Sequence, residues 1–487
     1  MKHATSTYLI LRLAIWLVIS VLGLMIIYPY KDGFDSVIFQ IVGQRLLLDD
    51  GVIYSDVFDH KGPMIFIINA LGLSFPYAME LLTVITTAVS LEMAWRISRL
   101  LCRARFVAVV SVLATTVFFF CTMAYNSTEQ WSVVFSFIAL YIGIRGIVRK
   151  ELILSRRDVV ILGICLAVTA LTRVNNCIFP LAVAAFYLFS YIPASRRQNL
   201  VPLLLWGIGG MAIVCIPISV YLIVNGAFGD MVYDSITYNL IYLGGNKIVH
   251  NHNLNDWIFS LLYRLPIWIT AMSAIVGIIW NKFNKNMAWL GLLTAVVSIV
   301  AIGFHMGYLH YYAILTPMIP LAVCFTALLA ANQIVESLSA LIVAFICLFI
   351  PVKALKACID QWQTTKISLD MTDIPAKRGE YKSLIDSLIQ SSERDSVYLH
   401  YTNVTTMYAI RDLGIKPYGR YFHQQDYHAK SSDIIRDSIE HTFRDNPPRW
   451  VISRKSSLND SSTIYPWLYK YTVVHPDSDF TILKLKN

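Results

Sequence analysis

Long stretches without a charged residue are the feature that most limits how this chain can fold. Residues 198–229 contain no Asp, Glu, Lys or Arg, and neither do residues 286–335. About twenty consecutive apolar residues in a helix span a bilayer, so the second stretch predicts two transmembrane helices and a turn. The helices of a large soluble protein would show polar residues at helical spacing, which these stretches lack. The sequence therefore predicts a polytopic membrane protein.

Basic residues cluster in short loops between the apolar stretches. Cytoplasmic loops carry such an excess, so the net charge of +9 indicates topology and not nucleic-acid binding. The clusters are Arg96, Arg99, Arg103 and Arg105; Arg145, Arg149, Lys150, Arg156 and Arg157; Arg196 and Arg197; and Lys282 and Lys285. With these loops in the cytoplasm, the N-terminus is cytoplasmic and the region after about Ala354 lies outside. We expect a multi-pass protein of a bacterial inner membrane.

The apolar stretches predict an all-α membrane domain of about eleven transmembrane helices over residues 1–353, with outer loops at 29–62 and 225–256. The expected spans are about 8–28, 77–98, 106–123, 131–147, 158–172, 177–192, 200–224, 257–280, 287–304, 312–331 and 336–353. Residues 63–75 are apolar but too short to cross, so they are expected to lie in the interface or to re-enter the membrane.

Residues 354–487 change character and predict a small α/β domain outside the cytoplasm. Helical patterns cover 377–391 and 433–446, and β-rich stretches cover 396–401 and 450–453. The chain ends in a predicted hairpin of 471–474 and 480–485 around a His-Pro-Asp-Ser-Asp turn. The eight cysteines form no disulfide framework, because seven lie in or beside apolar spans.

The first outer loop gathers ionisable residues beside the membrane. Asp35 follows the first span closely, has Asp32 as a neighbour, and precedes an amphipathic stretch. The loop ends in Asp56, Asp59, His60 and Lys61, directly before apolar residues. A single loop acid is by default only solvated. An adjoining apolar wall that excludes water would shift a carboxylate pKa, so this loop is the first candidate for an active site.

Two features of the first outer loop resemble the GT-C glycosyltransferases. One is an early Asp before a juxtamembrane helix, and the other is an acidic-Lys-Gly-Pro segment before a short interfacial helix. These include the protein O-mannosyltransferases and the lipid A aminoarabinose transferases, and the resemblance covers the first four spans best. It implies that Asp35 is the catalytic residue. It also implies that Lys61-Gly62-Pro63 contacts the phosphate of a lipid-linked donor, although the family has Lys-Pro-Pro where this chain has Gly62.

The chemistry of such a transfer suits these residues. Lys61 would neutralise the donor phosphate and stabilise the leaving group, and Asp35 would deprotonate an acceptor hydroxyl, giving inversion. Asp56, Asp59 and His60 are expected to orient substrates. The competing interpretation of Lys61 is a snorkelling membrane anchor.

Four further residues are candidates on other outer segments. The resemblance implies a second acid at Glu129, which would assist the base, orient the acceptor or hold a divalent ion; it equally suits a helix N-terminus capped by Thr128 or Ser127. Arg173 at the end of a span needs a partner, for which a lipid phosphate is suitable. His310 and Tyr311 would bind phosphate or sugar hydroxyls, or belong to an interfacial aromatic belt.

The sequence thus predicts a glycosyltransferase that moves a sugar from a polyprenyl-phosphate donor, such as an undecaprenyl-phosphate sugar, to an extracytoplasmic glycan, lipid or polymer such as O-antigen. No cofactor is expected, although a divalent cation is possible. No metal site is predicted among the histidines, because His305 and His310 are poorly spaced for one helical face. The alternatives are an O-antigen-type polymerase dependent on outer-loop arginines, and a transporter or flippase, which would bury ionisable residues in mid-span.

Overall fold

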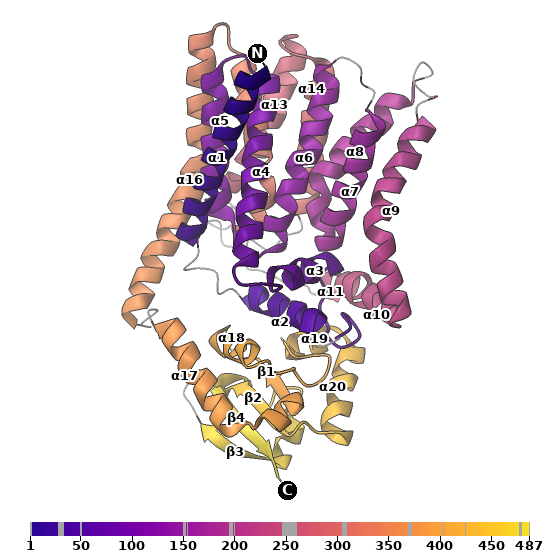
Figure 1. Ribbon diagram of the computed structural model, residues 1–487, viewed down its shortest axis with the longest axis vertical. Coiled ribbons are helices and arrows are strands. Elements are labelled where there is room, and N and C mark those ends of the chain that lie inside the picture. The colour runs from indigo at the N-terminus through magenta and orange to yellow at the C-terminus, as the bar shows by residue number, and fades with distance from the viewer. Residues whose placement is uncertain are drawn as a thin grey trace. The chain divides into compact units, whose positions relative to one another are not determined.

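The computed structural model describes the backbone of most of the chain (Figure 1). The described residues are 2–27, 34–48, 51–149, 152, 154–193, 198, 200–245, 261–303, 309–368, 373–402, 404–423, 425–476 and 480–486. Contacts within the chain define two compact units. The first comprises residues 1–31, 79–218 and 250–361, and the second comprises residues 32–78, 219–249 and 362–487.

The first unit is a bundle of helices joined by short connections. Its helices are α1 (Lys2–Ile27), α4 (Ala78–Leu101), α5 (Arg105–Thr122), α6 (Thr128–Val148), α7 (Arg156–Thr172), η2 (Val174–Cys177), α8 (Ile178–Tyr191), α9 (Leu200–Val224), α13 (Leu265–Ile279), α14 (Lys285–Gly303), η5 (Leu309–Leu315), α15 (Met318–Leu328) and α16 (Gln333–Ser368). The last residues of α9 and of α16 count with the second unit.

A helix lies at each of the eleven predicted spans. Among the described residues, eight helices are long and apolar enough to cross a membrane. The other three predicted spans coincide with shorter helices, namely α7 with 17 residues, α13 with 15 and α15 with 11. The prediction of a polytopic, predominantly helical membrane protein is confirmed.

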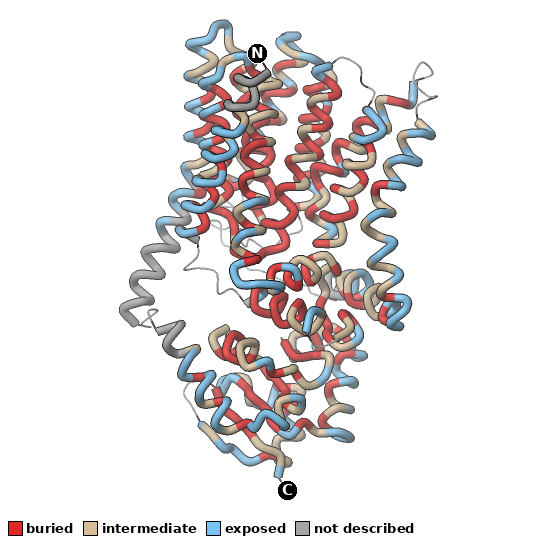
Figure 2. The backbone as a smooth tube through the Cα atoms, in the orientation of Figure 1, coloured by how far each residue is buried: buried red, intermediate tan, exposed pale blue. Residues whose placement is uncertain are grey.

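Burial separates inner from outer helices within this unit. The most apolar part of α6 is 67% buried, whereas that of α9 is only 11% buried. Figure 2 shows the same contrast, with buried residues along α6 and exposed ones along α9. Exposed apolar side chains such as Leu205 and Ile216 therefore form a lipid-facing surface on α9.

Glycines let α9 approach α7 closely. A Cβ at Gly163 of α7 would lie 2.2 Å from the carbonyl oxygen of Gly207, and a Cβ at Gly210 of α9 would lie 2.2 Å from the carbonyl oxygen of Val160. Membrane helices gain no hydrophobic driving force for association within lipid, so such close backbone packing is a main source of their attraction.

Replacing Gly210 by alanine should therefore destabilise the protein, because the new methyl group meets backbone that cannot rotate away. Overpacking of this kind costs about 1–3 kcal/mol. The adjacent Gly209→Ala is a matched control, since nothing lies within 4 Å of its Cβ position. Thermal unfolding in one detergent should show a lower midpoint for Gly210→Ala alone; equal midpoints for both variants would contradict this packing.

The second unit combines short helices with one small sheet. Its helices are α2 (Phe34–Leu48), α3 (Pro63–Gly72), α10 (Phe228–Val232), η4 (Tyr233–Thr237), α11 (Tyr238–Gly245), α17 (Asp373–Leu388), η6 (Ser391–Ser396), α18 (Val404–Asp412), α19 (Gln425–Ser431), α20 (Asp433–Asp445), η7 (Lys455–Ser457) and η8 (Tyr465–Lys470). The expected short helix after Lys61 is thus α3.

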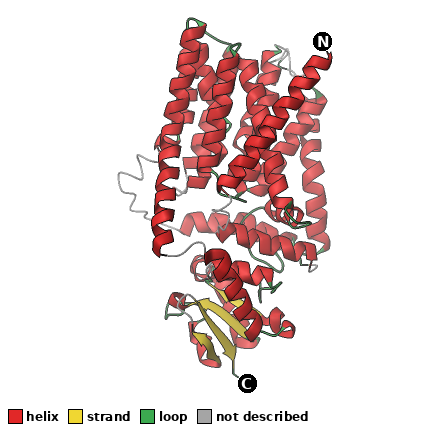
Figure 3. Ribbon diagram, turned by 60° about the vertical axis from the view of Figure 1, so that its left-hand side comes forward, coloured by secondary structure: helices red, strands yellow, loops and turns green. Residues whose placement is uncertain are grey.

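Four strands form the sheet in the order β1-β2-β4-β3, drawn in yellow in Figure 3. They are β1 (Val397–His400), β2 (Trp450–Arg454), β3 (Tyr471–Pro476) and β4 (Phe480–Leu485). β1 and β2 are parallel, with Val397 opposite Trp450, and α18, α19 and α20 occur in the crossover that a parallel pair requires. β3 and β4 form the predicted antiparallel hairpin, whose turn residues 477–479 lie outside the described residues.

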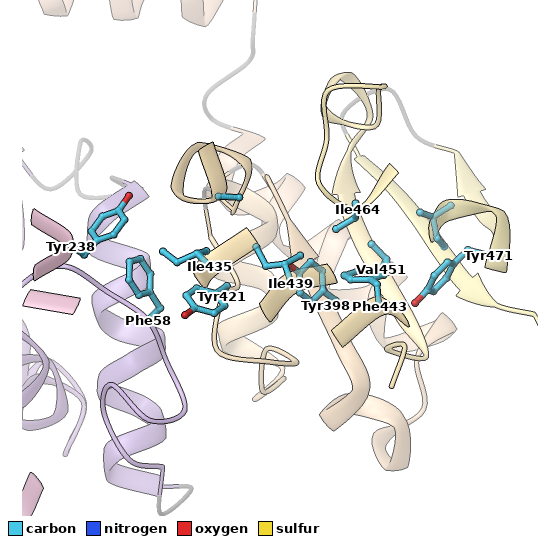
Figure 4. Packing of buried hydrophobic residues seen from close by; sticks show 12 residues of the cluster. Phe58, Tyr238, Tyr398, Tyr421, Ile435, Ile439, Phe443, Val451, Ile464 and Tyr471 are labelled. Atoms are coloured by element: carbon cyan, nitrogen blue, oxygen red, sulfur yellow. The ribbon is translucent and has the colours of Figure 1, made fainter. Parts of the chain in front are cut away.

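One apolar core joins three distant parts of the sequence in this unit. Phe58 and Tyr238, from the two predicted outer loops, belong to the same buried cluster as Tyr421, Ile435 and Val451 of the C-terminal region. Figure 4 shows Phe58 and Tyr238 next to Tyr421 and Ile435 at one end of this row of side chains. Packing thus groups residues 32–78 and 219–249, which include most of both predicted loops, with the C-terminal region. The sequence-based division placed the loops 29–62 and 225–256 in the membrane domain.

Candidate functional site

Phe58 connects the first predicted outer loop to the C-terminal region through its backbone and its ring. Its N–H donates to the carbonyl oxygen of Arg420 at 2.8 Å, and its carbonyl oxygen lies 3.0 Å from Nε2 of His423. The fully buried ring contacts Tyr238, His428 and Tyr421 with centroid separations of 5.1, 5.0 and 5.2 Å. These contacts fix the chain just before the three candidate residues Asp59, His60 and Lys61.

The second predicted loop is tied to the same region by polar groups. Nη2 of Arg420 lies 2.7 Å from both carboxylate oxygens of Asp234, whose side chain is inaccessible to solvent. The hydroxyl of Tyr238 lies 2.6 Å from Nδ1 of His428. Hydrogen bonds to ionised groups are the stronger kind, so the Arg420–Asp234 pair orients this segment.

Three hydrogen bonds hold the backbone of His60 and Lys61. The Lys61 N–H donates to Oδ1 of Asp59 at 2.9 Å, and the Tyr54 hydroxyl donates to the Lys61 carbonyl oxygen at 2.8 Å. Nδ2 of Asn239 donates to the His60 carbonyl oxygen at 2.8 Å. The Lys61 side chain therefore extends from a fixed backbone, as a preorganised binding group should.

The Lys61 ammonium lies at a concentration of positive charge. Its Nζ is 2.7 Å from Nε2 of His60, which accepts this hydrogen bond when the ring is neutral with its proton on Nδ1. Helix α3 begins two residues later, with Gly62 as an N-cap that has no side chain and Pro63 in the first turn. The first N–H groups of a helix lack partners and carry partial positive charge, so Lys61 and α3 together suit an anion.

Asp35 lies close to this arrangement. It occupies the first turn of α2, is exposed, and belongs to a helix that packs against α3. Burial lowers the pKa of the His423 ring from 6.5, and the negative charges of Asp59 and Asp35 oppose that shift, whereas Lys61 adds to it. All three charged residues therefore lie within electrostatic range of one buried ring. The neighbour Asp32 lies outside the described residues.

Tyr54 contacts the candidate site, although the sequence did not single it out. It is buried and adopts a φ of 69°, in the left-handed region that a bulky side chain occupies at a cost of about 1–3 kcal/mol. Burial raises the pKa of its hydroxyl well above 10, so the group stays protonated and can donate to Lys61. Only its place between Val52 and Asp56, in a chain turn, could have drawn attention to it.

Asp56 closes that turn. Its Oδ2 accepts the N–H of Val52 at 2.8 Å, and its carbonyl oxygen accepts from Nη1 of Arg45 at 3.3 Å. The carboxylate is thus used by the loop itself, and a role of Asp56 in orienting substrate remains a prediction.

The first unit brings four other candidates together. Oε1 of Glu129 lies 2.7 Å from Nη1 of Arg173, and the two side chains are 3% and 20% exposed. The Arg173 guanidinium also lies 4.4 Å from the centre of the Tyr311 ring, which packs edge-on against His310 at 4.5 Å. Ser127 is the N-cap of α6, because its side chain accepts from the N–H of Gln130.

The pairing couples the roles predicted for Glu129 and Arg173, because each neutralises the other's charge. Among the described residues there is no group of three or more His, Cys, Asp or Glu able to hold a metal ion. His305 and residues 246–260 of the second loop lie outside the described residues.

The membrane bundle and the small mixed sheet define a GT-C-like polytopic fold. Two structures of ArnT from Cupriavidus metallidurans share it over nearly the whole chain. The structure bound to undecaprenyl phosphate is 13% identical, covers 98% of both chains and has a TM-score of 0.51. The apo structure is 12% identical, covers 99% of this chain and 98% of its own, and has a TM-score of 0.53. No family model and no curated protein sequence matches this chain.

Removing one member of the Glu129–Arg173 pair should destabilise the protein far more than removing both. Arg173→Met leaves a buried carboxylate without compensation, which costs about 3–5 kcal/mol. The double variant Glu129→Gln/Arg173→Met should recover much of that loss in thermal unfolding, and Arg103→Met, at an exposed arginine, should have no effect. A double variant no more stable than Arg173→Met would show that the pair does not determine stability.

The two buried rings of His423 and His428 should lower the stability of the protein when the pH drops below about 6.5. Burial lowers the pKa of His423, and burial with His423 and Lys61 nearby lowers that of His428 well below 6.5. The unfolded chain then binds protons that the folded chain does not, at about 1.4 kcal/mol per pH unit for each ring. The unfolding midpoints at pH 7.5 and pH 5.5 should differ less in His428→Gln than in the wild type. In His441→Gln, a control at an exposed position, they should differ as much as in the wild type.

Proposed function

We propose that this protein is a glycosyltransferase that moves a sugar from a polyprenyl-phosphate donor to an acceptor outside the cytoplasm. The observation that carries the proposal is the Lys61 ammonium, held on a fixed backbone at the start of α3 with Asp35 and Asp59 nearby. An ammonium and a helix N-terminus bind a phosphate, and a carboxylate accepts the proton of an attacking hydroxyl.

The similar fold of ArnT supports the donor class. One ArnT structure was determined with undecaprenyl phosphate bound. A chain with the same fold reaches the same membrane-embedded pool of lipid-linked sugars. As the acceptor we propose an envelope polymer such as lipopolysaccharide O-antigen.

The proposed reaction is a single displacement. The acceptor hydroxyl attacks the anomeric carbon from the side opposite the phosphate, and its proton passes to Asp35. The bond between the anomeric carbon and the phosphate oxygen breaks, and Lys61 neutralises the charge that develops on that oxygen. The products are an inverted glycosidic bond and free polyprenyl phosphate. Asp59 and Tyr54 act as positioning residues, because they hold the backbone of Lys61.

The four candidates of the first unit enter the proposal with their predicted roles. Glu129 would assist the base, orient the acceptor or hold a divalent ion. Tyr311 would orient substrate, and Arg173 and His310 would contact the donor phosphate. The polymerase alternative requires arginines that are available to substrate. Arg420 in the C-terminal region is instead paired with Asp234, which favours the glycosyltransferase.

Asp35→Asn should nearly abolish transfer, because the amide keeps size and polarity but cannot accept a proton. A general base contributes about 10²–10⁴-fold to rate. The measurement is release of polyprenyl phosphate from a panel of polyprenyl-phosphate sugars in isolated membranes, which follows transfer to whichever acceptor the membranes contain. Lys61→Ala should raise the donor concentration needed for half-maximal release. Lys61→Arg should raise it less, because the arginine keeps the positive charge.

Membrane abundance of each variant is the control for folding. Normal release by Asp35→Asn together with an inactive Glu129→Gln would place the base in the first unit and overturn the assignment. Loss of wild-type activity on adding a chelator would show that a divalent cation takes part.

A further inference from the structure

A cavity of about 480 Å³ lies in the first unit, among residues of α4, α6 and α7 and the segment that joins α6 to α7. Its size is typical of a ligand site. None of the residues proposed for glycosyl transfer lines it. Its walls come from the helix ends that carry one of the basic clusters predicted to face the cytoplasm.

Three arginines and one aspartate line this cavity. Arg145 and Arg149 come from the end of α6, and Arg157 and Asp158 from the start of α7. Asp158 is ion-paired with Arg145, whose guanidinium also lies 5.2 Å from the centre of the Tyr141 ring. Within the described residues, Arg149 and Arg157 make no ion pair, so two positive charges remain for an anion.

The rest of the lining is apolar and extends into the membrane-spanning part of the helices. Ile138 and Arg149 both line the cavity and stand eleven positions apart along α6. At 1.5 Å per residue this separation is about 16 Å, roughly half of a 30 Å hydrocarbon core. Val89, Met93 and Ile142 add to this apolar part. The cavity is charged at one end and apolar over the depth of one leaflet.

From this geometry we infer that the cavity binds an anionic phospholipid of the leaflet next to the basic loops, such as phosphatidylglycerol. Its phosphate lies between Arg149 and Arg157, and an acyl chain lies along Val89 and Ile138. A free phosphate would use the arginines but not the apolar depth. Basic pockets between membrane helices on the cytoplasmic side bind such headgroups, and that leaflet is rich in anionic lipid.

The test measures lipid binding to the whole protein by native mass spectrometry in detergent. Phosphatidylglycerol and phosphatidylcholine with identical acyl chains serve as probes. Wild type should retain phosphatidylglycerol preferentially. Arg149→Ala/Arg157→Ala should weaken its binding about 30-fold, since each basic residue near an anionic headgroup contributes about a factor of five.

Two variants distinguish this site from general surface charge. Arg103→Ala/Arg105→Ala removes the same charge from another basic loop and should leave binding unchanged. Val89→Trp fills the apolar part, keeps every arginine, and should weaken binding. Equal losses in both arginine double variants, or undiminished binding by Val89→Trp, would overturn the proposal. Displacement of the lipid by soluble glycerol phosphate at similar concentration would show an anion site and not a lipid site.

Discussion

The second unit depends on the way Phe58 is enclosed. Its ring lies among Tyr238, Tyr421 and His428, and both of its backbone polar groups bond to the C-terminal region. A fully buried aromatic ring contributes several kcal/mol, and the hydrogen bonds on either side fix its direction. Lys61 follows three residues later, so this enclosure acts on its position together with the hydrogen bonds to Asp59 and from Tyr54.

Elements with a local signal could be predicted from the sequence. Uninterrupted apolar stretches located the spans, and alternation with a turn located the hairpin of β3 and β4. Asp35 and Lys61 were chosen as candidates because each adjoins an apolar segment, and a charge beside such a segment is conspicuous. The boundaries of one span were less accurate, because α15 has Pro317 as its N-cap and is much shorter than expected.

Partners could not be predicted, because they come from distant segments. His423 meets Phe58 across 365 residues, and Arg173 meets Glu129 across 44. Tyr54 is conspicuous only through a backbone dihedral angle that no sequence pattern shows. The carboxylate partners of several arginines are likewise visible only in three dimensions. Arg173 and Arg420 each face a carboxylate, and Arg12 and Arg96 share Glu92.

The contact between Phe58 and His423 also has a consequence for biosynthesis. A ribosome adds about 5–20 residues per second, so the 365 residues between them take roughly 20–70 s to synthesise. During that interval the segment around Phe58 has been made but its partners have not, and its aromatic side chains lack their final cover. The enclosure of Phe58 is thus completed only after His428 has been made. A chain that stops before Tyr421 would lack these partners of Phe58.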